Sequence, residues 1–243
     1  MSAARVAICD YGVGNLRSVE RALLHAGAEV VLTGDAETMR ACDGVVLPGV
    51  GAFGAAADAL DGAGLGEVVK DIARSGTPLL GVCLGHQLLF EHSDENGGRR
   101  GLGLLPGRIV RLGAERGKVP HMGWNQLQLT RESPLTGGVE DGAHVYFVHS
   151  YAALPDTTDA GAVVATADYG GPLVAICVRD NVWSTQFHPE KSGSTGLRIY
   201  ANFVRACARE HISPRADARR GGSTPTPSFA AGVQANDSVP PGA

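Results

Sequence analysis

The sequence predicts an α/β fold: a mostly parallel open sheet with helices on both faces and a mixed or antiparallel extension of the same sheet. Short β-rich segments alternate with helical segments through about the first ninety residues, and alternation at these lengths is typical of βαβ units. From about residue 105 to 187 the pattern changes to short strands separated by turn residues. The 243 residues are 44% apolar, so the chain can bury a sizeable core.

The individual elements follow from the spacing of the apolar residues. In the first half, β-rich runs predict strands at residues 5–9, 29–33, 44–49 and 77–83. Helical patterns with their stop signals predict helices from about Asn15 to Gly27, over about 52–75, at 84–92 and at about 194–210. The strands of the extension are predicted at 107–112, 125–130, 144–150, 162–167, 173–178 and 182–187.

The end of the chain has a different composition. Residues 213–243 are rich in Pro, Gly and Ser and contain one aromatic side chain. Such a segment has too little apolar surface to bury, so it is predicted to be a disordered tail. Residues 1–212 are then expected to form a single domain.

Composition and charge exclude several classes of function. A net charge of −4 and a pI near 6.0 leave no basic excess for nucleic acid or an anionic membrane. No apolar run approaches the roughly 20 residues of a membrane span, and the N-terminus passes directly into a strand rather than a secretory signal. The five cysteines are widely spaced without a C-x-x-C pair. This pattern favours free thiols in the cytoplasm over disulfides or a zinc site.

One cysteine stands at an unusual place. In "GVCLGHQ" (81–87) Cys83 lies between Gly81 and Gly85, where a predicted strand turns into a helix. This is the form of a nucleophile elbow, a sharp turn that presents its side chain. The helix N-terminus would favour the thiolate, and the Leu84 N–H would face an oxyanion on the attacked carbonyl. The alternative is a buried cysteine whose neighbouring glycines serve only packing, and the spacing alone does not decide between them.

A thiolate nucleophile needs a base, and the base needs an orienting acceptor. In "FHPEKS" (187–192) His188 follows a predicted strand and Pro189 separates it from Glu190. If Pro189 keeps the segment extended, both side chains project the same way and the carboxylate can fix the imidazole tautomer. A surface salt bridge would explain this motif taken alone. Together with the elbow, Cys83, His188 and Glu190 are interpreted as a catalytic triad.

A glycine-rich loop completes the predicted site. "LPGVGAFG" (47–54) leaves a strand and offers backbone N–H groups to an anion. A phosphate loop is excluded because no Lys-Ser/Thr follows at the required spacing. The loop fits the second half of an oxyanion hole, since the preceding strand of a parallel sheet ends beside the elbow.

In combination these motifs resemble the class I (triad) glutamine amidotransferases, whose fold is flavodoxin-like. The similarity is greatest to the glutaminase subunits of imidazole glycerol phosphate synthase in histidine biosynthesis, and it covers about residues 5–210. Its marks are the elbow "GVCLGHQ", the loop "PGVGAFG", "FHPEKS", "DYGVGNLRSV" (10–19), "GLGLLPGRIVRL" (101–112), "VPHMGWNQL" (119–127) and "YFVHSYA" (146–152). His86 departs from this pattern: the subunit family usually has methionine there, whereas other amidotransferases of the class carry histidine.

The resemblance implies a function and a partner. Glutamine would be hydrolysed through a glutamyl thioester on Cys83, without a cofactor or metal. The ammonia would pass to a (β/α)₈-barrel cyclase in a heterodimer, where the ribonucleotide intermediate PRFAR becomes imidazole glycerol phosphate and AICAR. A closed path between the two sites is expected, because ammonia released into water would be protonated and lost.

The resemblance also implies roles for further residues. Val50 and Leu84 would offer oxyanion amides, and Gly49 would let the Gly49–Val50 peptide reorient. The residues expected to bind glutamine are Gln87, Glu95 (at the α-amine), Ser150 and Tyr151 (at the carboxylate). The residues expected to face the cyclase are Asn15, Trp124, Tyr146 and Lys191. Simple core packing is the alternative for Trp124 and Tyr146.

Three other functions compete with this interpretation. One is an amidotransferase subunit that serves another ammonia acceptor. A second is a cysteine α/β-hydrolase acting on esters or lactones, although those enzymes usually place the acid between the nucleophile and the histidine in chain order. The third is an inactive scaffold, which would have no need for a complete triad.

Overall fold

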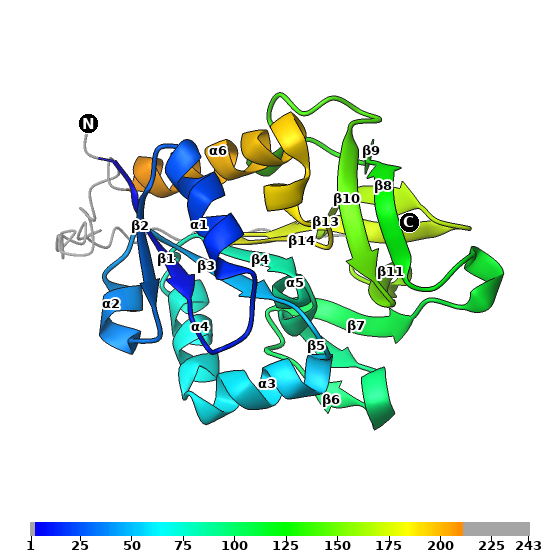
Figure 1. Ribbon diagram of the computed structural model, residues 1–243, viewed down its shortest axis with the longest axis horizontal. Coiled ribbons are helices and arrows are strands. Elements are labelled where there is room, and N and C mark those ends of the chain that lie inside the picture. The colour runs from blue at the N-terminus through cyan, green and yellow to red at the C-terminus, as the bar shows by residue number, and fades with distance from the viewer. Residues whose placement is uncertain (1–2, 211–243) are drawn as a thin grey trace, which may run out of the picture. The chain divides into compact units, whose positions relative to one another are not determined.

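The computed structural model describes residues 3–210 and confirms the predicted α/β class. The predicted tail at 213–243 and the predicted domain end at residue 212 lie outside the described residues. The main sheet has eight strands, in the order β2 (Glu29–Thr33), β1 (Arg5–Cys9), β3 (Gly44–Gly49), β4 (Leu79–Cys83), β14 (Val182–Thr185), β13 (Pro172–Arg179), β12 (Val163–Asp168) and β9 (Gln128–Leu129). The first five are parallel and the last three antiparallel (Figure 1).

Helices cover both faces of this sheet because its strands are apolar on both sides. On β1, Val6 and Ile8 face one core, whereas Ala7 and Cys9 face the other. The first core includes α1 (Leu16–His25) and α6 (Gly193–Glu210). The second core includes α2 (Ala36–Arg40), α3 (Phe53–Gly62), α4 (Leu65–Arg74) and α5 (Leu84–Leu88). Figure 1 shows the two groups on opposite sides of the parallel strands.

The predicted helix at 84–92 is wrong beyond Leu88. Helix α5 ends there, and β5 (Phe90–Ser93) follows at once. The apolar run fits both periods, and the fully buried Phe90 is used by a strand that pairs with β7 (Leu105–Arg111). The predicted helical region 52–75 is two helices, α3 and α4, because Gly64 adopts a left-handed φ of 69° between them.

The predicted single extension of the sheet is also wrong in part. Strands β12, β13 and β14 do join the main sheet, but β11 (Tyr151–Thr158), β7, β5 and β6 (Arg99–Arg100) form a separate four-stranded sheet. Strands β10 (His144–His149) and β8 (His121–Gln126) form a two-stranded ribbon. Strand pairing over such separations depends on tertiary contacts, which the alternation of apolar residues does not encode.

Among residues 3–210, four short 3₁₀ helices complete the structure, at Glu95–Gly97, Ala114–Arg116, Pro134–Thr136 and Pro189–Lys191. The sequence patterns did not predict the five-residue α2, which is too short to show a period. Its N-terminus is capped by Asp35, whose Oδ1 accepts from Thr38 N at 2.8 Å. No helix in this part of the chain combines the length and apolarity that a membrane crossing requires.

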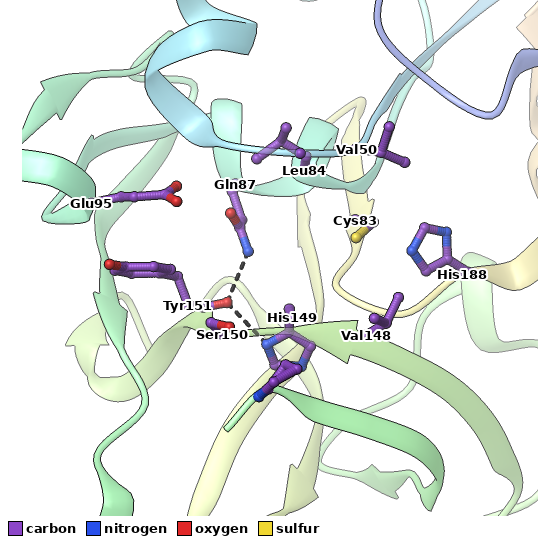
Figure 2. Close-up of a pocket in the computed structure, with 12 residues that line it drawn as sticks. Val50, Cys83, Leu84, Gln87, Glu95, Val148, His149, Ser150, Tyr151 and His188 are labelled. Carbon is purple, nitrogen blue, oxygen red and sulfur yellow. Dashed lines mark hydrogen bonds between the residues drawn. The ribbon is translucent and has the colours of Figure 1, made fainter. Parts of the chain in front are cut away.

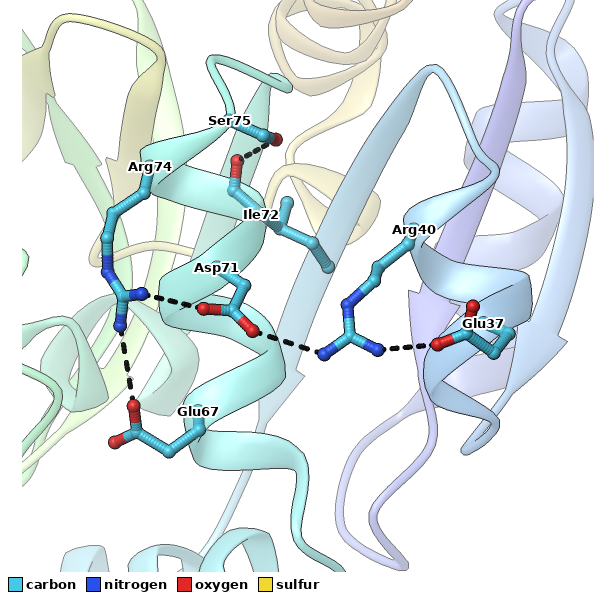
Figure 3. A network of polar contacts seen from close by, with 7 residues as sticks. All are labelled: Glu37, Arg40, Glu67, Asp71, Ile72, Arg74 and Ser75. Atoms are coloured by element: carbon cyan, nitrogen blue, oxygen red, sulfur yellow. Dashed lines mark hydrogen bonds and ion pairs between the residues drawn. The ribbon is translucent and has the colours of Figure 1, made fainter.

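Surface ion pairs connect α2 to α4 (Figure 3). Arg40 contacts Glu37 on its own helix at 2.7 Å and Asp71 on α4 at 3.1 Å. Asp71 also accepts from Arg74 at 2.7 Å, and Arg74 reaches Glu67 at 3.4 Å. Since all five side chains are partly exposed, water screens these pairs, and the apolar residues beneath them hold the helices on the sheet.

Candidate active site

Cys83 sits on a strained turn between β4 and α5. Its φ of 54° and ψ of −107° lie outside the regions that ordinary residues populate. A Cβ on Gly85 would lie 1.8 Å from the Leu47 carbonyl oxygen, and one on Gly81 would lie 2.8 Å from the Gly85 carbonyl oxygen. The two glycines are therefore required for close backbone approach. The strain itself is carried by Cys83.

The order of the strands brings the other predicted segments to this turn. Gly49, at the end of β3, is the register partner of Cys83 on β4. On the other side of β4, Thr185 of β14 pairs with Val82, and the chain continues to His188. The carboxyl ends of three parallel strands thus deliver the thiol, the glycine-rich loop and the histidine to one edge of the sheet.

His188 and Glu190 meet, but the backbone differs from the prediction. His188 Nδ1 lies 2.7 Å from Glu190 Oε1, and these side chains are only 3% and 1% exposed. The segment is not extended throughout. The backbone of His188 is extended, but Pro189 begins the 3₁₀ helix Pro189–Lys191. Proline favours extended backbone before it and fits the first position of a helix. The tight turn after His188 brings the carboxylate back to the imidazole.

Hydrogen bonds to the backbone hold this turn. Ser192 Oγ donates to the His188 carbonyl at 2.6 Å and accepts from Tyr146 N at 3.0 Å. His188 N donates to the Tyr146 carbonyl at 3.0 Å. Tyr200 Oη on α6 lies 3.5 Å from the second oxygen of Glu190. The segment from His188 to Ser192 is thereby held by hydrogen bonds to both β10 and the last helix.

The environment of His188 favours the imidazolium. Burial disfavours the charge, but the hydrogen bonds and negative charges of Cys83 and Glu190 outweigh burial and raise the pKa of His188 to about 10. Because Nδ1 is used by Glu190, Nε2 is the nitrogen left for the thiol, and Figure 2 shows Cys83 and His188 facing each other.

The glycine-rich loop is anchored just before its exposed part. Tyr11 Oη donates to the Pro48 carbonyl at 2.7 Å, and burial raises the pKa of Tyr11, so the phenol keeps the proton that it donates. A Cβ on Gly49 would lie 2.8 Å from that hydroxyl and 2.9 Å from Gly85 N. Val50 is 40% exposed. The loop therefore changes from tightly packed at Gly49 to solvent-facing at Val50, beside the thiol.

A cavity of about 360 Å³ opens at this edge of the sheet (Figure 2). The predicted site residues that line it are Val50, Cys83, Leu84, Gln87, Glu95, Ser150, Tyr151 and His188. Two predicted residues are not part of the lining. Glu190 lies behind His188, and Gly49 packs closely against Tyr11 and Gly85. The volume suits a small molecule such as an amino acid.

The polar side chains of the cavity wall are already oriented. Gln87 Nε2 donates to the Tyr151 carbonyl at 2.8 Å and to Gln186 Oε1 at 3.1 Å. Glu95 Oε2 accepts from Phe53 N at 2.7 Å, at the first residue of α3. The wall opposite the thiol therefore presents amide and carboxylate oxygens, which suit a ligand with N–H donors.

The residues predicted to face a partner do not form core. Trp124 is 57% exposed, and its ring packs edge-on against Tyr146, its register partner across the ribbon. The Lys191 ammonium lies 5.8 Å from the centre of the Tyr146 ring. Asn15 precedes α1, which packs near the 3₁₀ helix that contains Lys191. Core packing is thus the wrong explanation for Trp124.

The sequence patterns missed several residues of this region. The cavity lining also contains Gly51, Pro120, Val148 and His149. His149 contacts Tyr151 and His121. Both histidines lie in quoted motifs, "YFVHSYA" and "VPHMGWNQL", but neither was given a role from the sequence. His86 is fully buried, with Nδ1 2.8 Å from Ser184 Oγ and its ring against Phe90. Within residues 3–210, no group of three or more His, Cys, Asp or Glu is arranged to hold a metal ion.

The buried histidines predict a sensitivity to acid. Burial lowers the pKa of both His86 and His149 from 6.5 to about 3. Below pH 6.5 the unfolded chain therefore binds protons that the folded chain does not bind. The stability that these two neutral histidines contribute is complete above pH 6.5 and is lost as the pH falls toward 3. Each group contributes about 1.4 kcal/mol per pH unit, so the pair lowers the free energy of unfolding by about 3 kcal/mol per unit.

Urea unfolding at about pH 7 and about pH 5.5 measures this loss. The variant His86→Met has a side chain of similar volume and one buried imidazole fewer. Its free energy of unfolding should therefore fall by about 1.4 kcal/mol less per pH unit than that of the wild-type chain. Equal midpoints for the wild-type chain at both pH values would contradict the buried, neutral state of these histidines.

The comparisons with known proteins identify the family to which this chain belongs. Residues 7–207 match the family model of glutamine amidotransferase class-I. A solved glutamine amidotransferase superposes with a TM-score of 0.66 at 19% identity, covering 84% of this chain and 98% of that one. The structure of PurLQS from Thermotoga maritima also gives a TM-score of 0.66 at 19% identity, covering 84% of this chain and 98% of that one. The chain belongs to the class-I glutamine amidotransferase family.

Relatives of higher identity narrow the family. The imidazole glycerol phosphate synthase subunit HisH of Halobacterium salinarum is 53% identical over 213 residues, 84% of this chain and 94% of that protein. The subunit HisH of Geobacillus kaustophilus is 50% identical over 204 residues, 82% of this chain and 95% of that protein. Within the class-I glutamine amidotransferases, the chain is therefore a member of the HisH family.

Proposed function

We propose that this chain hydrolyses glutamine to glutamate and ammonia as the glutaminase subunit of an imidazole glycerol phosphate synthase. The observation that carries the proposal is the strained Cys83 facing the His188–Glu190 pair within a cavity of amino-acid size. Membership of the HisH family supports this synthase over other ammonia acceptors. The same membership, together with the Cys–His–Glu order along the chain, disfavours a cysteine ester hydrolase.

In the first half of the reaction the Cys83 thiolate attacks the side-chain carbonyl of glutamine. The C–S bond forms as the carbonyl π electrons move to oxygen, and the N–H groups of Leu84 and Val50 are proposed to stabilise the resulting oxyanion. Gly49 would let the Gly49–Val50 peptide turn toward it. The His188 imidazolium then gives its proton to the departing nitrogen, so the C–N bond breaks and ammonia leaves a thioester.

In the second half, water replaces Cys83 on the acyl carbon. His188, now neutral, takes a proton from the water as it attacks, and the C–S bond breaks to return the thiolate and glutamate. Glu190 holds Nδ1 of His188 throughout, which keeps Nε2 directed at the reacting atoms. No metal or cofactor enters either half, because the thiolate is the nucleophile and the imidazole moves the protons.

Glutamine is proposed to lie with its side-chain amide at Cys83 and its α-carbon groups at the far end of the cavity. The Glu95 carboxylate would receive the α-ammonium, and Gln87 would hold the head group beside it. The backbone N–H groups of Ser150 and Tyr151 would donate hydrogen bonds to the α-carboxylate of glutamine. The carbonyl oxygens of both residues already accept hydrogen bonds within the protein, so the N–H groups are the backbone atoms proposed for the substrate.

The partner is proposed to be a (β/α)₈-barrel cyclase, bound as a heterodimer against the surface of Asn15, Trp124, Tyr146 and Lys191. The exposed Trp124 makes a rigid aromatic anchor, and Lys191 brings a charge to its rim. Ammonia would reach the cyclase through a closed path, and the cyclase would convert PRFAR to imidazole glycerol phosphate and AICAR. The cytoplasm is the proposed compartment, where Cys83 stays reduced.

The test is a glutaminase assay with and without the cyclase and its ribonucleotide substrate. Ammonia production should be low for the isolated chain and should rise at least about tenfold when both are added. Trp124→Ala should weaken the complex by about 2 kcal/mol or more, the loss typical of a buried aromatic anchor. Leu24→Ala, at a similarly exposed apolar side chain on α1, is the control and should bind normally.

Two outcomes would count against the proposal. If glutamine hydrolysis did not respond to the cyclase, the chain would serve another acceptor. If Trp124→Ala and Leu24→Ala bound the cyclase equally well, the partner surface would lie elsewhere.

A further inference from the structure

Two buried histidines connect the cavity wall to the β8–β10 ribbon. His149 ends β10 and lines the cavity, and His121 is its register partner at the start of β8. Their rings are joined, with His149 Nε2 3.1 Å from His121 Nδ1. His121 is stacked between Phe147, at 4.7 Å, and Tyr169, at 4.0 Å between ring centres. None of the roles proposed above involves this pair.

The hydrogen bonds fix which nitrogen of each ring carries the proton. The Tyr151 carbonyl can only accept, so His149 Nδ1, at 2.9 Å, must donate to it. His149 Nε2 then accepts from His121 Nδ1, and His121 Nε2 accepts from Asn125 Nδ2 at 3.3 Å. Asn125 also donates to the Asp168 carbonyl at 2.8 Å. Each hydrogen bond in this series is donated in the same direction, from Asn125 toward the cavity.

Burial supports the neutral form of both rings. It lowers the pKa of His149 to about 3 and that of His121 to about 4. Both ring nitrogens of His149 are occupied by neighbours, so His149 is not available as a second proton-transfer group near Cys83. Its position at the cavity therefore needs another explanation.

That explanation lies at the Tyr151 carbonyl. This oxygen accepts from His149 Nδ1 and also from Gln87 Nε2 at 2.8 Å. Gln186 Oε1 takes the other Gln87 hydrogen at 3.1 Å, so the Gln87 amide nitrogen is committed and its oxygen is available to a ligand. Figure 2 shows the Gln87 nitrogen turned to Tyr151 and the oxygen turned away from it. A shift of the Tyr151 carbonyl would release this orientation.

We infer that His149 and His121, both as Nδ1–H tautomers, are positioning residues that fix the Tyr151 carbonyl and so aim the Gln87 oxygen at the substrate. The effect on catalysis rests on the proposed glutaminase function. Strand β8 presents His121 inward and the exposed Met122 and Trp124 outward. The relay therefore also links the glutamine site to the strand that carries the proposed partner surface.

The first test needs no activity. Long-range ¹H–¹⁵N spectra of the full chain labelled with ¹⁵N-histidine should show His149 and His121 as Nδ1–H tautomers, whereas a free neutral imidazole prefers Nε2–H. The spectra of His149→Asn and His121→Asn assign the two signals. Finding His149 as the Nε2–H tautomer would overturn the inference, whether or not the chain proves to be a glutaminase.

The second test separates substrate binding from turnover in the complex with the cyclase. His149→Leu removes the donor and should raise the KM for glutamine about tenfold, the value of roughly one hydrogen bond, with a smaller change in kcat. His149→Asn keeps an N–H near the Nδ1 position and should stay within about threefold of wild-type KM. If the leucine variant does not fold, His149→Gln serves instead, because its N–H lies near the Nε2 position.

An unchanged KM in His149→Leu, or equal losses in the asparagine and leucine variants, would contradict a positioning role for the Nδ1 donor. A wild-type complex that fails to hydrolyse glutamine would instead contradict the proposed function, and the tautomer measurement would still decide the hydrogen-bond relay.

Discussion

Replacing Cys83 with alanine should abolish glutamine hydrolysis by the complex and spare synthesis from free ammonia. No other nucleophile stands at the turn between β4 and α5, so the thioester cannot form. We expect a loss of at least about 10⁴-fold in kcat, the scale on which loss of a catalytic nucleophile is measured. The cyclase carries its own chemistry, so high ammonium at raised pH, where more NH₃ is present, should restore product formation.

Substitutions of the other two residues of the proposed triad should reduce glutamine hydrolysis to different extents. His188→Asn should behave like Cys83→Ala, because the proton donor and acceptor is lost with the imidazole. Glu190→Gln should be milder by roughly one to two orders of magnitude, since an orienting group contributes less than the nucleophile or base. All three should bind the cyclase as wild type does. Glutamine hydrolysis at the wild-type rate by the Cys83→Ala complex would show that the triad assignment is wrong.

Gly85→Ala should damage both stability and glutaminase activity, although it adds a single methyl group. The new Cβ would lie 1.8 Å from the Leu47 carbonyl oxygen and 2.8 Å from the Leu47 carbonyl carbon. Backbone cannot yield as a side chain does, so β3 and α5 must separate. Overpacking of this kind costs about 1–3 kcal/mol or more. Leu47 begins the glycine-rich loop, three positions before Val50, so the shift also moves Val50 relative to Cys83.

Gly54→Ala is the matched control for this prediction. Gly54 lies in the first turn of α3, and a Cβ there would meet no atom within 4 Å. Since alanine is the better helix former, this variant should be unchanged or more stable by about 0.5–1 kcal/mol. Thermal unfolding and kcat with glutamine measure both variants. If Gly85→Ala matched Gly54→Ala in both, the close approach of Leu47 and Gly85 would not be what fixes the elbow.

The sequence determined the parts of this protein that short segments encode. The alternation of apolar runs predicted the parallel sheet, because each βαβ unit is decided within about thirty residues. The elbow around Cys83 and the glycine-rich loop were visible because their backbone shapes require glycine at fixed positions, Gly85 above all. The contact of His188 with Glu190 could be anticipated because a single residue, Pro189, separates them, even though the extended backbone expected between them proved to be a 3₁₀ turn.

Only the tertiary structure decided the features that depend on pairing between distant segments. Phe90–Ser93 became a strand, because β7 lay beside it and a buried Phe90 was needed there. The segment around residue 146 was predicted to extend the main sheet, but it forms a separate ribbon, β10 with β8. Strand pairing is determined by tertiary packing and not by apolar alternation. His149 gained its role from a carbonyl and a histidine on neighbouring strands, and no spacing in the sequence marks such a hydrogen bond. The role inferred for His149 therefore depends on contacts with His121 and Tyr151 that only the folded structure provides.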